Sequence, residues 1–178
     1  MADPTTPYWL SIVAAVAPAA SILGLIAAAV IGYRSDRNLE KEKRDSESRH
    51  LAAAFVGELV SIRRIVAIRG YRELIGRFAE NAEVHGSRYV PKLHVRQNYL
   101  GVYDSNNGRL GLLPSDIVSD LAIVYTSMKS VIDDFNTMAD GRLDEKEPEF
   151  IARFLRELEK LYVETIDRAD DIIERLAC

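Results

Sequence analysis

The 178-residue sequence predicts an all-α protein in three parts: one N-terminal transmembrane helix, a charged helical stalk and a cytosolic antiparallel helical bundle. Three observations indicate this class. An uncharged run lies near the N-terminus, a highly charged stretch without proline or glycine follows it, and apolar residues recur at helical spacing over most of the remaining chain. The predicted boundaries are 1–33 for the N-terminal tail and membrane helix, 34–50 for the stalk and 51–178 for the bundle.

The membrane helix is predicted from the interval between Asp3 and Arg34, which holds no charged side chain. Within it, "WLSIVAAVAPAASILGLIAAAVIG" covers residues 9–32. As a helix at 1.5 Å per residue this run is about 36 Å long, enough to cross a hydrocarbon core of about 30 Å. The tail before it has no basic residue, which argues against a cleaved signal peptide. We therefore expect contact with the lipid bilayer through residues 9–32.

The orientation of this helix is predicted from its flanking charges. No basic residue precedes it, whereas residues 34–50 hold six, which are Arg34, Arg37, Lys41, Lys43, Arg44 and Arg49. Basic flanks stay on the cytoplasmic side of a membrane. We expect a single-pass protein of the cell inner membrane, with its N-terminus outside and everything after Tyr33 in the cytoplasm.

Small residues fall at every fourth position of the membrane segment and form one stripe on a helix: Ala20, Gly24, Ala28 and Gly32. Such a stripe lets a second membrane helix approach closely, so these are the helix-packing candidates and self-association is expected. Alanine is frequent throughout the segment, however, so composition alone also produces this pattern.

The stalk, residues 34–50, has Leu39 as its only large apolar residue. Glu40 precedes Arg44 by four positions and Asp45 precedes Arg49 by four, the order that stabilises a helix. A disordered linker is the alternative, because the stretch is polar on every side.

The bundle is predicted from three apolar stripes at helical spacing, around Leu51 to Phe78, Val118 to Met138 and Ile151 to Leu176. In the last stripe, successive positions are 4, 3, 4, 3, 4, 3 and 4 residues apart: Ile151, Leu155, Leu158, Tyr162, Thr165, Ala169, Ile172 and Leu176. This seam packs either into the domain's own core or against another chain. The turn of roughly ten residues before it favours antiparallel packing on the preceding helix.

Between the first two stripes, residues 81–98 are predicted to be a connection, punctuated by Gly86 and Pro91. The next stretch, "VYDSNNGRLGLLPSDIV", is polar enough to suggest a catalytic loop. We interpret it as architecture, with a short helix ended by a left-handed Gly108 and a new helix begun at Pro114.

Charge is unevenly distributed along the chain. Residues 60–100 hold eight Arg or Lys and three Glu, a net +5, and residues 139–178 hold twelve acids and seven bases, a net −5. Neighbouring helices of opposite charge explain this asymmetry. The arginines lack the interleaved aromatic residues of a nucleic-acid surface, so no nucleic acid is expected as a partner.

We find no pattern that predicts catalysis. There is no GxSxG sequence and no phosphate-binding loop, and the three histidines lack the spacing of a metal site. The acid pairs Asp133–Asp134 and Asp170–Asp171 diverge by about 100° on a helix, so neither pair converges on one ion. The sequence therefore predicts no enzyme, no catalytic, cofactor-binding or metal residue, and identifies no small-molecule ligand.

The run "VYDSNNGRLGLLPSDIVSDLAIVYTSM", residues 102–128, resembles a segment of small uncharacterised bacterial single-pass membrane proteins, which have one N-terminal membrane helix and a helical cytosolic part. The matching positions are Tyr103, Leu110, Gly111, Leu113, Pro114, Val118 and Tyr125. The resemblance implies a layout and no activity.

Two functions fit these expectations. The first is a membrane-anchored helical scaffold or adaptor that binds another protein, or itself, at the cytoplasmic face of the inner membrane. The alternative is a membrane effector or sensor, whose transmembrane helices assemble and perturb the membrane when the cytosolic domain is triggered.

Overall fold

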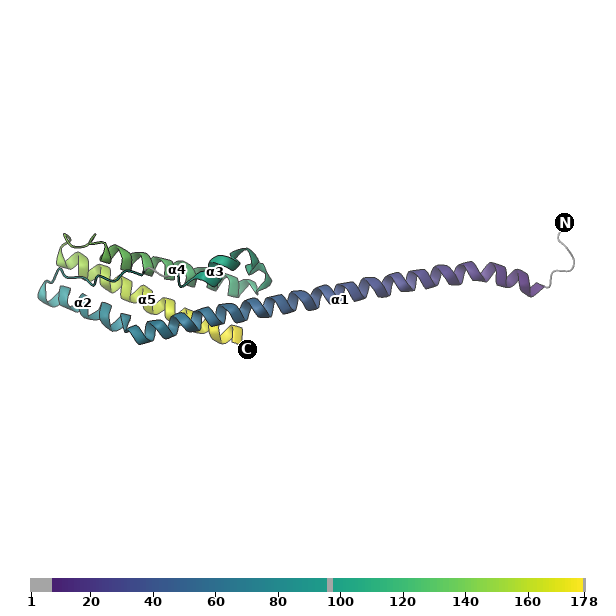
Figure 1. Cartoon of the computed structure of the whole chain (residues 1–178), viewed down its shortest axis with the longest axis horizontal. Coiled ribbons are helices and arrows are strands. Elements are labelled where there is room, and N and C mark those ends of the chain that lie inside the picture. Colours follow the sequence, from purple (N-terminus) through teal and green to yellow (C-terminus); the bar gives the residue numbers. More distant parts are fainter. Residues whose placement is uncertain (1–7, 96–97, 178) are drawn as a thin grey trace. The chain divides into compact units, whose positions relative to one another are not determined.

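The computed structural model describes the backbone of residues 8–95 and 98–177, and the side chains within those ranges from residue 31 onward. These ranges contain five α-helices and one 3-10 helix, and no strand (Figure 1). They are α1 (Tyr8–Arg69), α2 (Tyr71–His85), α3 (Gly101–Asn106), η1 (Asn107–Leu112), α4 (Ser115–Ala139) and α5 (Pro148–Ala177). The predicted all-α class is confirmed.

The chain divides into two compact units, residues 1–46 and residues 47–178. Almost all of the predicted membrane span, residues 9–32, lies outside the residues whose side chains are described. Among the residues whose side chains are described, no helix is long and apolar enough to cross a membrane.

The stalk is helical along its whole length, because α1 passes through residues 34–50 without a break. Its side chains are exposed up to Asp45, and Leu39 is 62% exposed. Helix rather than disordered linker is therefore the conformation found here. The second unit begins at Glu47, slightly before the predicted boundary at 50, since the Ser48 hydroxyl already donates a hydrogen bond to the Leu112 carbonyl.

The first helix of the bundle differs from the prediction. The apolar stripe suggested one helix from Leu51 to about Ala79, but α1 ends at Arg69 and α2 begins at Tyr71. Gly70 separates them with φ of 59° and ψ of 39°, the left-handed conformation that glycine adopts at little cost. Residues 81–85, predicted to belong to the connection, instead extend α2 to a second left-handed glycine, Gly86.

The two long C-terminal helices pack antiparallel. The start of α4 meets the end of α5, where the Arg175 guanidinium donates to Asp116 at 2.6 Å and to Asp120 at 2.6 Å. The turn between the two helices, residues 140–147, returns the chain over Leu143, which is buried. The predicted turn is confirmed, although Leu143 makes it partly apolar.

The seam of α5 lies in the domain's own core. Seven of its eight positions are buried, and only Leu176 near the helix end is half-buried. The wider stripe of α4 is buried in the same way, at Ile117, Leu121, Val124, Tyr125, Met128, Val131, Phe135 and Met138. Of the two interpretations left open for the α5 seam, the structure supports packing within the chain.

The loop before α4 differs in detail from the prediction. Gly108 is not left-handed; among the described residues only Gly70, Gly86 and Gly141 have positive φ. The short helix α3 passes instead into the 3-10 helix η1. Pro114 stands one position before the first helical residue, with ψ of 142°, and its carbonyl accepts the hydrogen bond from the Val118 amide.

Candidate functional site

Of the four predicted helix-packing residues, Ala20, Gly24 and Ala28 lie outside the residues whose side chains are described. Gly32 is exposed, and a Cβ atom added there would meet no atom within 4 Å. Space for a close neighbour therefore exists at that position.

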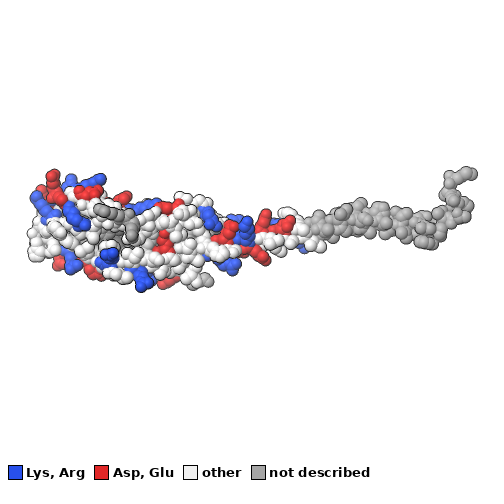
Figure 2. All heavy atoms as spheres, in the orientation of Figure 1, with Lys and Arg blue, Asp and Glu red and all other residues white. Residues whose placement is uncertain are grey.

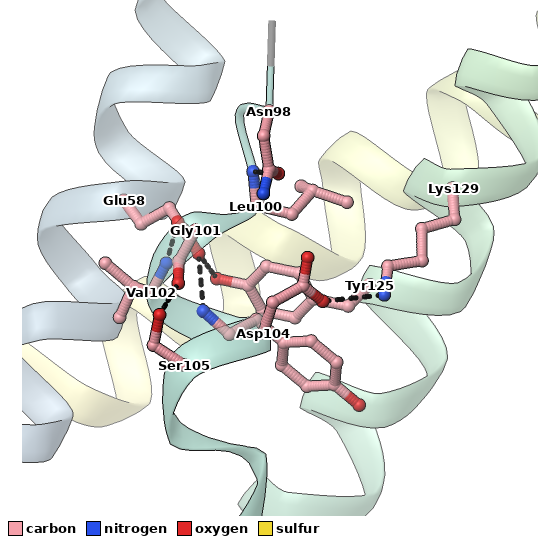
Figure 3. A network of polar contacts seen from close by, with 10 residues as sticks. Glu58, Asn98, Leu100, Gly101, Val102, Asp104, Ser105, Tyr125 and Lys129 are labelled. Atoms are coloured by element: carbon pink, nitrogen blue, oxygen red, sulfur yellow. Dashed lines mark hydrogen bonds and ion pairs between the residues drawn. The ribbon is translucent and has the colours of Figure 1, made fainter.

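The short helix α3, which lies within the polar stretch before α4, is held in place by a network of polar contacts (Figure 3). The carboxylate of Glu58, on α1, accepts hydrogen bonds from the amides of Val102 at 2.6 Å and Tyr103 at 3.2 Å, and from the Tyr125 hydroxyl at 2.6 Å. The first turn of any helix leaves its amides without partners inside the helix, and here a carboxylate from another helix supplies them.

The aromatic rings beside Glu58 complete this arrangement. The rings of Tyr103 and Tyr125 stack with centroids 4.1 Å apart, and Phe55 meets the Tyr125 ring edge-on at 6.0 Å. Burial, followed by the hydrogen bond to Glu58, raises the pKa of the Tyr125 hydroxyl far above its ordinary value. Tyr125 therefore stays protonated and acts as a donor that fixes α4 against α1.

The other polar side chains of the loop also make structural contacts. Asp104 accepts from Lys129 at 2.7 Å, and this hydrogen bond lowers the pKa of the Asp104 carboxyl. The Asn106 amide donates to the Val102 carbonyl at 2.8 Å. The Ser105 hydroxyl donates to the Gly101 carbonyl one turn back. These contacts agree with the interpretation of the loop as architecture.

The acid pairs are not arranged as a metal site in the part of the chain that is described, where no group of three or more potential ligands gathers. Asp133 is exposed, while burial and then the charge of Asp133 raise the pKa of Asp134. Asp170 forms an ion pair with Arg63, 3.2 Å from Nε to Oδ1. The side chains of His50, His85 and His94 are all exposed.

Opposite charges are mixed over the surface of the bundle, and Figure 2 shows basic and acidic side chains interspersed on the face that it presents. The predicted packing of a basic helix against an acidic one is not found between α2 and α5, because α2, which packs against α5, carries two arginines and three glutamates. Arg156 of α5 is bidentate to Glu83 of α2, at 3.0 and 2.8 Å.

One helix face of the second unit has no partner within it. The exposed residues of α1 between positions 53 and 68 are mostly small or apolar: Ala53, Ala54, Gly57, Val60, Ser61, Arg63, Arg64, Ala67 and Ile68. Val60 is 43% exposed and Ile68 is 73% exposed. Arg64 is exposed and, unlike Arg63, is in no ion pair with another described residue. We call residues 53–68 on this side the outer face of α1.

The second unit also contains an apolar cavity of about 90 Å³. It lies between two groups of core residues, one centred on the contact of α2 with α5 and the other on the contact of α1 with α4. The end of α1, the start of α2, the segment before α3, and the middle of α4 and α5 all contribute to its walls.

Sequence reasoning missed both Glu58 and the cavity. Glu58 accepts from residues 44 and 45 positions later, and spacing within one helix carries no sign of that. The outer face had a visible signal, because exposed helix positions with alanine, glycine and valine depart from a solvated face.

Comparison of this chain with protein-family models, with curated proteins and with solved structures finds no match.

Proposed function

We propose that this protein is a membrane-anchored helical adaptor, whose cytosolic bundle binds another protein through the outer face of α1. The predicted membrane span at residues 9–32, the basic flank after it and the resemblance of residues 102–128 to small bacterial single-pass membrane proteins support the anchor. The observation that carries the proposal is the outer face itself, where the exposed side chains of Val60 and Ile68 share one helix face with small residues and form an apolar strip. Contiguous apolar patches on a protein surface mark interaction sites, whereas scattered single apolar residues do not.

The composition of this face defines the partner. Gly57 has no atom within 4 Å of its Cβ position, so another helix can approach the backbone of α1 closely there. Val60 and Ile68 supply apolar contact, and between them Arg64 supplies a positive charge that forms no ion pair with another described residue. The complementary partner is an amphipathic helix whose apolar stripe is flanked by Asp or Glu.

A second copy of the chain fits this face poorly. Two chains anchored in one membrane with the same orientation would bring their α1 helices together in parallel. Arg64 of one copy would then face Arg64 of the other, and like charges at a close contact are destabilising. Self-association is accordingly assigned to the membrane stripe and not to the outer face.

The test is photo-crosslinking in cells with benzoylphenylalanine placed at Val60, or at Ile123 as a control. Ile123 is 45% exposed on α4, so the two probes are equally accessible. We expect a discrete crosslinked product from position 60 and none from position 123. Arg64→Glu should remove that product, whereas Arg77→Glu, on α2, should leave it.

Products of equal yield from both probes, or a product unaffected by Arg64→Glu, would exclude a specific partner at this face. A crosslink only to another copy of the chain would assign the face to self-association. Loss of membrane potential on overproduction would favour the alternative function, a membrane effector or sensor.

A further inference from the structure

We propose that the apolar cavity of the second unit binds a small uncharged aromatic ligand of about one ring. The site lies within the bundle, separate from the outer face of α1, so this inference does not depend on the adaptor function.

The cavity wall excludes charged ligands. None of the lining residues that the structure describes is Asp, Glu, Lys, Arg or His. Thr165 is among the lining residues, and its hydroxyl already donates to the Leu161 carbonyl at 2.6 Å. An ion placed here would lose its hydration without gaining a counter-charge, which is strongly unfavourable. The ligand must therefore be apolar over the part that enters.

The volume sets the size of that part. In another protein, an engineered apolar cavity of about 150 Å³ takes benzene. The present cavity of about 90 Å³ is partly open, and several of its lining residues, including Ile65 and Ile166, are half-buried. One ring can therefore enter with an edge directed toward the opening, whereas a fused ring system or a long acyl chain cannot fit inside.

The side chains around the cavity favour an aromatic ligand over an aliphatic one. Tyr71 and Phe135 both line it, with ring centroids 5.4 Å apart and planes at 48°. A third ring at this site can meet their edges and faces in the tilted geometry that aromatic groups prefer. The thioether of Met128 lies in the same wall, and sulfur contacts with ring edges are favourable.

Methionine methyl NMR gives a direct test in the full chain, reconstituted in lipid nanodiscs. The sequence has three methionines, of which Met128 lines the cavity and Met138 is buried in the core outside the lining. Benzene is the probe, supplied at fixed vapour pressure so that its free concentration is independent of uptake by lipid. We expect a saturable shift of the Met128 methyl signal and no shift of the Met138 signal.

Two phenylalanine variants separate filling of the cavity from other effects. Val66→Phe places a ring in the cavity wall and should abolish the Met128 response, whereas Val60→Phe adds the same ring on the outer face and should leave the response intact. Ile166→Phe, also in the wall, replaces Val66→Phe if the Met138 signal shows that the latter has disturbed the core. Equal movement of both methyl signals, or a full response with the cavity filled, would overturn the proposal.

Discussion

At the residue scale, Glu58 connects three helices through a single carboxylate. Glu58 belongs to α1. Its carboxylate accepts hydrogen bonds from two amides in the first turn of α3 and from the Tyr125 hydroxyl on α4. A helix of six residues is too short to be stable alone, so α3 depends on such contacts. The interaction also explains why Tyr125 is a tyrosine and not a phenylalanine at a fully buried stripe position.

Replacement of Glu58 by glutamine should therefore destabilise the bundle. A carboxamide has one acceptor oxygen where the carboxylate has two, so at least one of the three donors loses its partner. We expect the free energy of unfolding to fall by roughly 1–3 kcal/mol, measured by urea unfolding followed by circular dichroism. Asp104→Ala, which removes an exposed ion pair, is the control and should change little. An unchanged urea midpoint for Glu58→Gln would contradict this account.

Tyr162 should make the bundle sensitive to alkaline pH. Burial raises the pKa of its hydroxyl to about 12, against an ordinary value of about 10. The unfolded chain thus releases this proton first, so the stabilisation is complete below about pH 10 and is lost progressively between about pH 10 and 12. In that window the free energy of unfolding falls as pH rises, and Tyr162→Phe should make this fall less steep by up to about 1.4 kcal/mol per pH unit. Equal slopes for wild type and variant would show that the hydroxyl titrates normally when folded.

At the scale of elements, periodic apolar stripes were enough to place α4 and α5, because both helices bury a continuous face in one core. The break at Gly70 could not be predicted in the same way. Val66, Leu74 and Phe78 keep helical spacing across it, and one glycine inside a helix costs only about 1 kcal/mol relative to alanine. Whether the helix breaks or continues at Gly70 depends on how the following residues pack on α5. The spacing of apolar residues carries no information about that packing.

Two glycine substitutions with opposite expected effects test the break. Gly57 lies inside α1 with no atom near its Cβ position, so Gly57→Ala should raise the free energy of unfolding by about 0.5–1 kcal/mol. Gly70 has φ of 59°, so Gly70→Ala should lower it by roughly 1–2 kcal/mol. Thermal unfolding of both variants beside wild type measures the difference. Stabilisation by Gly70→Ala would indicate that α1 and α2 form one continuous helix.

At the scale of the whole molecule, the buried seam of α5 limits how copies of the chain can associate. A second copy could use that seam only by opening the domain's core. The loop network shows the same limit of sequence reasoning, since its structural role was predictable from composition whereas its central residue, Glu58, was not. Hydrogen-bond partners that are distant in the sequence are brought together by the packing of separate helices, and that packing cannot be read from a single sequence.

Self-association is therefore predicted to reside in the membrane helix. We expect a homodimer or small homo-oligomer in mild detergent, held by close packing along Ala20, Gly24, Ala28 and Gly32. Gly24→Ile should weaken it most, because it places a branched side chain in the middle of the stripe. Light scattering over a range of protein concentrations measures the effect, with Leu25→Ile as the control beside the stripe. A monomeric wild type would rule out association, and an equally associated Gly24→Ile would place it elsewhere than the stripe.

The adaptor proposal requires a bundle held at the cytoplasmic face of a membrane, and the location of the C-terminal end tests this most directly. Green fluorescent protein and alkaline phosphatase, each fused after Cys178, report the cytoplasm and the periplasm respectively. Because basic residues follow the predicted membrane span and none precedes it, we expect fluorescence in the membrane fraction and no phosphatase activity. Phosphatase activity would place the bundle outside the cell membrane, and fluorescence confined to the soluble fraction would show that residues 9–32 do not anchor the chain.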